Sequence, residues 1–270
     1  MTNPVIFLIG VDFVDLEDIA RDNGIYLSPT GGQSNNHGYH LGFKSNGSVD
    51  IFKIKKTSYV WGIHIDNTSA WQKDYHTITE ETFIENKTLP EGCGLIFAED
   101  KTWVEGVVKG KVTLASAKVS QSNFKSDIII NGDITYTTND GSDGLTLIAE
   151  NSILIPLIIS DTLNINGIMI AQGGYFGRNL YPCWYSPNDH RSSLKTHGSI
   201  VSNGRVGTKW GYSGAGCGSV SGCPRRRACP ASNVLLSSAQ ISSIIGALLA
   251  RSAGRRTRAL TGLACSAIVT

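Results

Sequence analysis

The sequence has 270 residues, a formal net charge of +2, 41% hydrophobic residues and 17% charged residues. These values are those of a globular protein with room for one β-domain and flanking segments. Residues 215–270 carry seven arginines and no lysine, acidic or aromatic residue, so the first 214 residues hold the other 17 basic residues against all 22 acidic ones. Such an acidic body has no general electrostatic reason to bind nucleic acid.

Neither a signal peptide nor a membrane-spanning segment is predicted. Met1–Pro4 lacks a basic region, the following apolar run is short, and no run of about 20 apolar residues occurs. The six cysteines include no C-x-x-C pair and do not indicate a disulfide framework.

Residues 1–36 are expected to form a small N-terminal segment. The apolar run Val5–Ile9 fits a strand, and Asp15–Gly24 has the acidic first turn and glycine stop of a short helix. Residues 29–36 have the composition of a loop.

Residues 37–97 are expected to form a β-hairpin region. Two alternating runs, Tyr39–Phe43 and Val49–Ile54, flank a Ser-Asn-Gly turn at 45–47. The aromatic run Ser58–Ile65 is expected to extend this sheet, whereas Thr77–Leu89 fits either a loop or a partial strand.

Residues 98–214 read as a series of short apolar β-runs separated by small or polar corners. Glycines at the corners are Gly106, Gly132, Gly167 and Gly198, spaced 26 to 35 residues apart. Such spacing predicts a wound all-β structure, a right-handed parallel β-helix forming a short irregular solenoid. Segments 117–126, 138–144 and 173–193 would then bulge from the coils. An antiparallel sandwich of the same strands is the alternative.

Residues 215–270 form a basic, low-complexity tail. Its abrupt loss of acidic, lysine and aromatic residues is typical of translation in a shifted reading frame, and we expect it to be artefactual or poorly ordered. The alternative is a genuine basic arm on an amphipathic helix at Asn233–Ala250, which would contact a membrane surface or nucleic acid.

Four stretches carry a resemblance to a known family. They are Trp103–Ala115, Asp127–Tyr136, Asp140–Asn151 and Gly198–Gly207. These stretches resemble the surface β-helix domains of PilX-like, type IV pilus-associated proteins of candidate-phylum bacteria, across about residues 39–214.

The resemblance implies a cell-surface or extracellular domain. In that family the domain follows a prepilin-like membrane helix, so the chain is expected to be an N-terminally incomplete copy that departs from the family after about Gly214. The implied partners are other pilus or cell-envelope proteins, and the membrane is reached only through the missing helix. The family supplies no catalytic residues.

An aromatic, glycine-rich loop is the strongest candidate for binding a carbohydrate or a protein partner. Its aromatic residues are Tyr175, Phe176, Tyr181, Trp184 and Tyr185. If exposed, these rings would stack on a surface glycan or a partner chain. The alternative is that they cover the open side of the solenoid.

The nearest approach to a metal motif lies at residues 139–150. Asn139, Asp143 and Glu150 occupy positions 1, 5 and 12 of a spacing that resembles an EF-hand calcium loop. Position 3 is Gly141, which offers no side-chain oxygen, so a turn explains the same residues and no cofactor is expected beyond this calcium hypothesis.

Candidate residues for glycoside cleavage are also few. Carbohydrate-cleaving enzymes need paired carboxylates across a groove, and the candidates are Asp127, Asp133, Asp140 and Asp143, with His197 and Arg205 as companions. Polar residues are expected at turns and corners whatever the function, so these positions do not by themselves indicate catalysis. His197 is expected to face solvent. The sequence therefore predicts a non-enzymatic structural or adhesive β-helical module, with a carbohydrate-binding or carbohydrate-cleaving β-helix as the alternative.

Overall fold

The computed structural model describes residues 12–31, 37–90, 94–120 and 125–210. Its elements in chain order are α1 (Phe13–Asn23), β1 (Ile25–Leu27), β2 (Tyr39–Phe43), β3 (Ser48–Gly62), β4 (Gln72–Thr88), β5 (Gly94–Ala98), β6 (Thr102–Val108), β7 (Lys111–Ser116), β8 (Ile128–Tyr136), β9 (Gly144–Ala149), β10 (Ile153–Ile155), β11 (Thr162–Ala171), β12 (Phe176–Arg178), the 3-10 helix η1 (Cys183–Tyr185) and β13 (Ser193–Ser202). Strands dominate, so the all-β prediction is confirmed.

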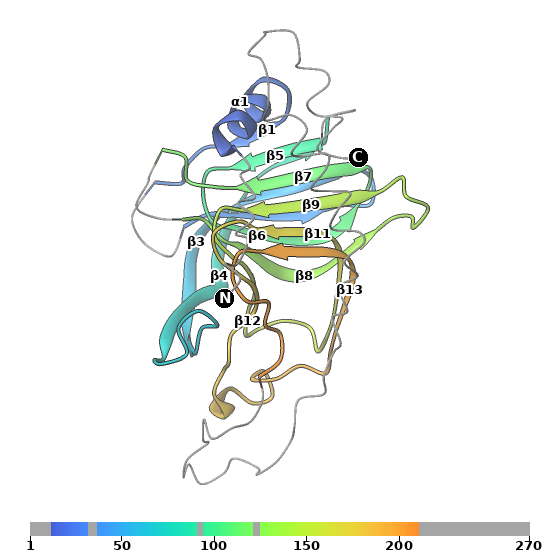
Figure 1. The fold of residues 1–270 in the computed structure, drawn as a ribbon. Coiled ribbons are helices and arrows are strands. Elements are labelled where there is room, and N and C mark those ends of the chain that lie inside the picture. The colour runs from blue at the N-terminus through green and yellow to red at the C-terminus, as the bar shows by residue number, and fades with distance from the viewer. Residues whose placement is uncertain (1–11, 32–36, 91–93, 121–124, 211–270) are drawn as a thin grey trace, which may run out of the picture.

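The strands form one curled sheet in which most neighbours are parallel. One side of it runs in the order β1-β5-β7-β9-β11-β13, and every pairing along it is parallel. Figure 1 shows these strands stacked from α1 at one end to β13 at the other. The antiparallel sandwich is therefore wrong, because its neighbouring strands would run in opposite directions.

Along the chain, strands of a second parallel set alternate with the strands of the first set. These strands are β2, β6, β8, β10 and β12, which pair in that order. Beyond a bend, the later halves of β6 and β8 pair with each other, and Ile134 of β8 pairs with Ile165 of β11. Successive passes of the chain therefore lie on top of one another.

Glycines form several of the bends, as the sequence predicts. Gly106, Gly167 and Gly198 have φ values of 114°, 152° and 136°, a region that side chains with a Cβ rarely adopt. At Gly106 an added Cβ would lie 2.2 Å from the carbonyl oxygen of Phe43 on the neighbouring strand. The bend therefore needs glycine for its backbone conformation and for its close packing.

The interior enclosed by these strands is apolar. Its largest cluster contains Ile96, Leu114, Leu147 and Met169 from one side and Ile128, Ile130 and Ile153 from the other, all almost fully buried. These residues occupy equivalent positions on neighbouring strands. Burial of such ladders, at about 25 cal/mol per Å² of apolar surface, stabilises the stack.

A long antiparallel hairpin, β3–β4, packs on the outside of the second set of strands. Strand β2 joins it to the body, pairing antiparallel with β3 and parallel with β6. Figure 1 shows the far end of the hairpin projecting beyond the stack. Trp103, Ile129 and Leu154 face outward from β6, β8 and β10 and pack with Ile54 of β3, so the hairpin shields this outer face from water.

Helix α1 covers part of the other outer face. Asp12 caps it by accepting a hydrogen bond from the Val14 N–H at 3.0 Å. Leu16 and Ala20 pack with Leu95, Phe97 and Ala115, which face outward from β5 and β7. The predicted short helix is thereby confirmed.

Other expectations have mixed outcomes. The hairpin at 39–54 is confirmed, and all of the segment 77–89 except Leu89 lies within the full strand β4. The segment 173–193 is not wholly a bulge, because it contains β12, which pairs with β10. The Val5–Ile9 strand, most of the 29–36 loop and the tail from residue 215 lie outside the described residues.

Candidate functional site

A column of polar residues stands immediately before the strands of the second set. Lys101, Asp127, Ser152 and Tyr175 precede β6, β8, β10 and β12, and the strand registers place them at equivalent positions. Backbone N–H groups link them: Thr102 donates to the Asp127 carbonyl at 3.0 Å and Ile128 donates to the Ser152 carbonyl at 2.9 Å. Each pass of the chain therefore contributes one residue to a single polar column.

Strand β4 lies over this column and closes a cavity of about 210 Å³. The indole N–H of Trp103 donates to the His76 carbonyl at 2.7 Å, which ties β4 to β6. The hairpin contributes His64, Asp74 and His76 to the cavity wall, opposite Lys101 and Asp127. Five titratable side chains from distant parts of the sequence thus meet in one hollow.

His64 and Asp74 form a hydrogen-bonded ion pair at one side of the cavity. His64 Nε2 bonds to Asp74 Oδ1, and Asp74 Oδ2 accepts from Asn179 Nδ2 at 2.9 Å. Burial opposes both charges, but the pairing outweighs it, raising the pKa of His64 and lowering the pKa of Asp74. Both Asp74 oxygens are engaged, so this carboxylate orients His64 rather than facing a ligand.

Asp127, unlike Asp74, has hydrogen bonds from the described residues to only one of its carboxylate oxygens. Its Oδ1 accepts from Asn151 Nδ2 at 2.8 Å and from the Ser152 N–H at 3.0 Å. No hydrogen bond from the described residues reaches its Oδ2. Burial raises the pKa of Asp127, and the positive charge of Lys101 and these hydrogen bonds offset only part of that rise.

Lys101 and His76 complete the cavity. Burial lowers the pKa of Lys101, with partial compensation from Asp127 and Asp100. Burial also lowers the pKa of His76 to about 4, so its imidazole is neutral at physiological pH. His76 is 6% exposed, and its Nδ1 has no hydrogen-bond partner within the described part of the chain. Opposed pKa shifts within one cavity are typical of functional sites.

Next to the cavity lies a group of five aromatic side chains, the aromatic surface, defined as Tyr59, Trp61, Trp71, Trp184 and Tyr185, of which the first four are exposed and Tyr185 is half-buried. Trp71 and Trp184 have ring centroids 5.9 Å apart, and Tyr59 and Trp61 have theirs 6.1 Å apart. The Trp61 N–H donates to the Tyr185 hydroxyl at 2.9 Å, which joins the hairpin to the segment around η1. Trp184 is 59% exposed and Tyr59 is 48% exposed.

Two residues connect the aromatic surface to the cavity. Lys73 and Tyr75 both line the cavity. The Lys73 ammonium also lies 4.4 Å from the ring centroid of Tyr59, and the Tyr75 ring packs against Tyr59 with centroids 5.8 Å apart. The two features are therefore neighbours, linked by Lys73 and Tyr75 of β4.

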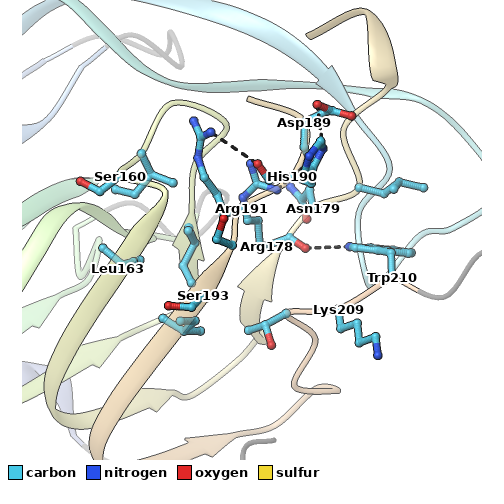
Figure 2. Close-up of a pocket in the computed structure, with 16 residues that line it drawn as sticks. Ser160, Leu163, Arg178, Asn179, Asp189, His190, Arg191, Ser193, Lys209 and Trp210 are labelled. Carbon is cyan, nitrogen blue, oxygen red and sulfur yellow. Dashed lines mark hydrogen bonds and ion pairs between the residues drawn. The ribbon is translucent and has the colours of Figure 1, made fainter. Parts of the chain in front are cut away.

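A second, smaller cavity of about 80 Å³ lies beside the last strands (Figure 2). Two arginines dominate it, but their guanidinium groups hold loop carbonyls: Arg178 donates to Asn188 and Asp189, and Arg191 donates to Pro187 and Leu157. Figure 2 also shows the Trp210 indole directed at the Arg178 carbonyl, 2.8 Å away. These contacts fix the loop that carries Trp184 and Tyr185.

The predicted aromatic binding residues separate into two groups. Phe176 is fully buried in the interior and Tyr181 is 3% exposed in a cluster with Val60 and Leu157, so the prediction that these two contact a ligand is wrong. Tyr175 is also buried, although it lines the main cavity. Trp184 is 59% exposed, whereas Tyr185 is half-buried and contacts the Trp184 ring with centroids 6.0 Å apart, so a binding role for this pair stays a prediction.

The calcium hypothesis is wrong in its geometry. Asp143 and Glu150 lie at opposite ends of β9, which spans Gly144–Ala149 in extended form, about 20 Å long. Asp143 accepts hydrogen bonds from Gly110, Thr137 and Thr138, whereas Glu150 accepts from Lys118 and Ser126. Asn139 is exposed in the turn. In the described part of the chain no cluster of three or more His, Cys, Asp or Glu residues suits a metal ion.

Of the candidate carboxylates, Asp127 alone lines the main cavity. Asp133 binds Asn164 in the next strand, and Asp140 accepts from Ser142 within its own turn. Arg205 and His197 are exposed, which confirms the expectation for His197. The structure thus does not bring these predicted companions together.

Sequence reasoning missed the partners of Asp127. His64, Asp74 and His76 come from the hairpin, some 50 residues before Asp127, and only the fold of the hairpin over the coils brings them close. Lys101 was detectable in principle, because Lys101, Asp127 and Ser152 each directly precede an apolar run. Trp61 and Tyr59 alternate in sequence, which indicates one shared strand face.

Comparisons with known proteins give no identification. No protein-family model matches the chain, and searches of curated proteins and of solved structures return no significant match. Within the described residues, no helix has the length and apolarity needed to cross a membrane.

Proposed function

We propose that this protein is a non-enzymatic, cell-surface adhesive module, a right-handed parallel β-helix that binds glycans through its aromatic surface. The observation that carries the proposal is a set of four exposed rings, Tyr59, Trp61, Trp71 and Trp184, whose two pairs are joined by the hydrogen bond from the Trp61 N–H to the half-buried Tyr185. Exposed apolar groups gathered in one place mark interaction sites, whereas scattered ones do not.

The parallel ladders support the β-helical part of the proposal. Each pass of the chain returns to pair in parallel with the previous one. Connections between parallel strands of one sheet are right-handed in nearly all proteins, because of the twist of the strands. A stack of this kind is a rigid spacer, suited to presenting a binding surface away from an anchor.

A glycan suits the aromatic surface better than the apolar surface of a protein partner does. The rings are tilted relative to one another by 43° to 85° and do not form one flat apolar plane. Aromatic rings can pack against the C–H faces of sugars, while neighbouring polar groups bond to the hydroxyls. Lys73 and the adjoining cavity supply such polar groups.

Two features support the proposed location. The sequence resembles pilus-associated surface domains, whose partners are other cell-envelope proteins. Cys183, at the start of η1, is disulfide-bonded, and disulfides persist in oxidising environments outside the cytosol. Both support a cell-surface or extracellular position, with membrane attachment through another segment as in that family.

Carbohydrate cleavage is the second candidate, favoured by the presence of Asp74 and Asp127 in one cavity. A glycosidase needs two free carboxyl groups, and Asp74 is fully buried with both oxygens bonded. Binding is therefore preferred over cleavage. Release of new reducing ends from a bound polysaccharide would favour the enzyme instead.

The test is glycan binding by the intact chain and two matched variants. Trp184→Ala removes the most exposed ring of the aromatic surface and is expected to weaken binding at least tenfold, as loss of a central aromatic contact does. Phe83→Ala is the control, because Phe83 is 54% exposed but packs with Phe52, outside the aromatic surface.

The three proteins are first screened for binding to immobilised cell-wall and surface polysaccharides. For each polysaccharide that binds, titration calorimetry with its soluble form then compares the affinities of the three proteins. Equal affinity of all three proteins, or binding to no glycan, would contradict the proposed function.

A further inference from the structure

Among the described residues, the main cavity contains a cation, Lys101, that forms no ion pair. Lys101 lines the cavity, and none of the hydrogen bonds or ion pairs of the described residues involves its Nζ. The nearest aromatic ring is that of Trp103, whose centroid is 5.8 Å away. A partly buried ammonium group has lost water and gains most from an anionic partner.

The other charges of the cavity do not fill this role. Asp74 is committed to His64 and Asn179. His76 carries no charge at neutral pH, and its Nδ1, which has no hydrogen-bond partner among the described residues, is a donor or an acceptor depending on the tautomer. Asp127 lies close enough to influence Lys101 but makes no ion pair with it.

Asp127 can adapt to a second negative charge. Because burial already raises its pKa, this carboxyl group takes up a proton more readily than an ordinary aspartate. Once protonated, its Oδ2 becomes a hydrogen-bond donor. The other ionisable residues that line the cavity with it are Asp66, Lys73, Tyr75 and Tyr175, and the Tyr175 hydroxyl already donates to Asn179 Oδ1 at 2.9 Å.

We propose that this cavity binds the carboxylate group of an acidic sugar residue, with Lys101 as the counter-ion and Asp127 as a proton-carrying partner. The inference rests on the proposed function and names its ligand class. A volume of about 210 Å³ accommodates one sugar ring. The rest of the glycan then runs past Lys73 and Tyr75 onto the aromatic surface.

The experiment compares acidic oligosaccharides with their carboxyl-reduced, neutral counterparts, using fragments of polygalacturonate, alginate and hyaluronan. Wild-type protein is expected to bind at least one acidic form at least tenfold more tightly than its neutral counterpart, by titration calorimetry. Lys101→Met is expected to abolish this preference and to keep the neutral affinity. Lys109→Met is the matched control, because Lys109 is exposed at the turn between β6 and β7.

The pH dependence gives a second readout. An anion placed beside Asp127 raises its pKa further, so binding takes up a proton and the affinity for the acidic form rises from pH 7 to pH 5. Asp127→Asn is expected to remove this rise while keeping the preference for the acidic form. The circular dichroism spectrum of each variant establishes that it is folded.

The outcomes separate the two proposals. Glycan binding that depends on Trp184 but is equal for acidic and neutral forms would overturn the acidic-sugar site and leave the proposed function standing. Displacement by acetate at equal concentration would also overturn it, because any carboxylate would then suffice. Absence of all glycan binding would overturn both.

Discussion

The two faces of strand β8 show how this fold separates stability from chemistry. Ile128 and Ile130 point into the coil and stack on apolar residues of neighbouring strands. Ile129 points outward beneath the hairpin. Asp127 directly precedes β8 and belongs to the column of polar residues that lines the cavity. The interior repeats one kind of residue in every pass, whereas the outer column changes from lysine to aspartate to serine to tyrosine.

The difference follows from what covers each face. The inner face of the curled sheet is filled by buried apolar side chains, and the backbone groups of its strands bond to one another, so a charge there would have no partner. The outer column is covered by the β3–β4 hairpin alone, whose polar side chains and adjoining cavity stabilise charges. A curled parallel sheet of this kind can therefore vary its outer column without altering its core.

The largest expected effect concerns the interior. Ile130→Ala is expected to lower the free energy of unfolding by about 2–5 kcal/mol, because it removes buried methyl groups and leaves a cavity. Ile158→Ala is the matched control, since Ile158 is 49% exposed, and its change is expected to stay within about 0.5 kcal/mol. Urea unfolding followed by circular dichroism measures both, and equal values would remove the distinction between the two environments.

An intermediate effect is expected in the cavity. The pKa of His76 falls from 6.5 to about 4 on folding, so the unfolded chain binds the proton first as pH decreases. The stability supplied by neutral His76 is complete above pH 6.5 and is lost as pH falls toward 4, by about 3 kcal/mol in total.

Urea unfolding between pH 4 and 7.5 tests this, with His76→Gln as the comparison because glutamine does not titrate. The wild-type protein should lose stability relative to this variant on acidification. His40 and His64 have raised pKa values and act in the opposite direction, but they are common to both proteins. Parallel pH profiles would contradict the burial of a neutral His76.

The smallest effect on stability is expected at the aromatic surface. Trp184→Ala should change the free energy of unfolding by less than about 0.5 kcal/mol, because the ring is 59% exposed. Its effect on glycan binding should be far larger. A loss of stability comparable to that of Ile130→Ala would show that the ring belongs to the core rather than to a binding surface.

The sequence by itself determined the local features. Alternating apolar residues specified the hairpin at 39–54, the acidic turn and glycine stop specified the helix near Asp15–Gly24, and the glycines at 106, 167 and 198 marked bends. These features depend on neighbouring residues and on backbone conformation, which are readable along the chain. For Trp184 the sequence left open whether the ring is exposed or covers the strands, and in the structure it is 59% exposed.

Tertiary structure decided which residues share a site. Whether Phe176 and Tyr181 face solvent depends on neighbouring passes of the chain, which bury them. Asp143 and Glu150 are separated because the segment between them pairs as an extended strand with β7 rather than wrapping an ion. His64, Asp74 and His76 meet Lys101 and Asp127 because a hairpin formed from residues 48–88 folds over the coils, a long-range contact that no local pattern encodes.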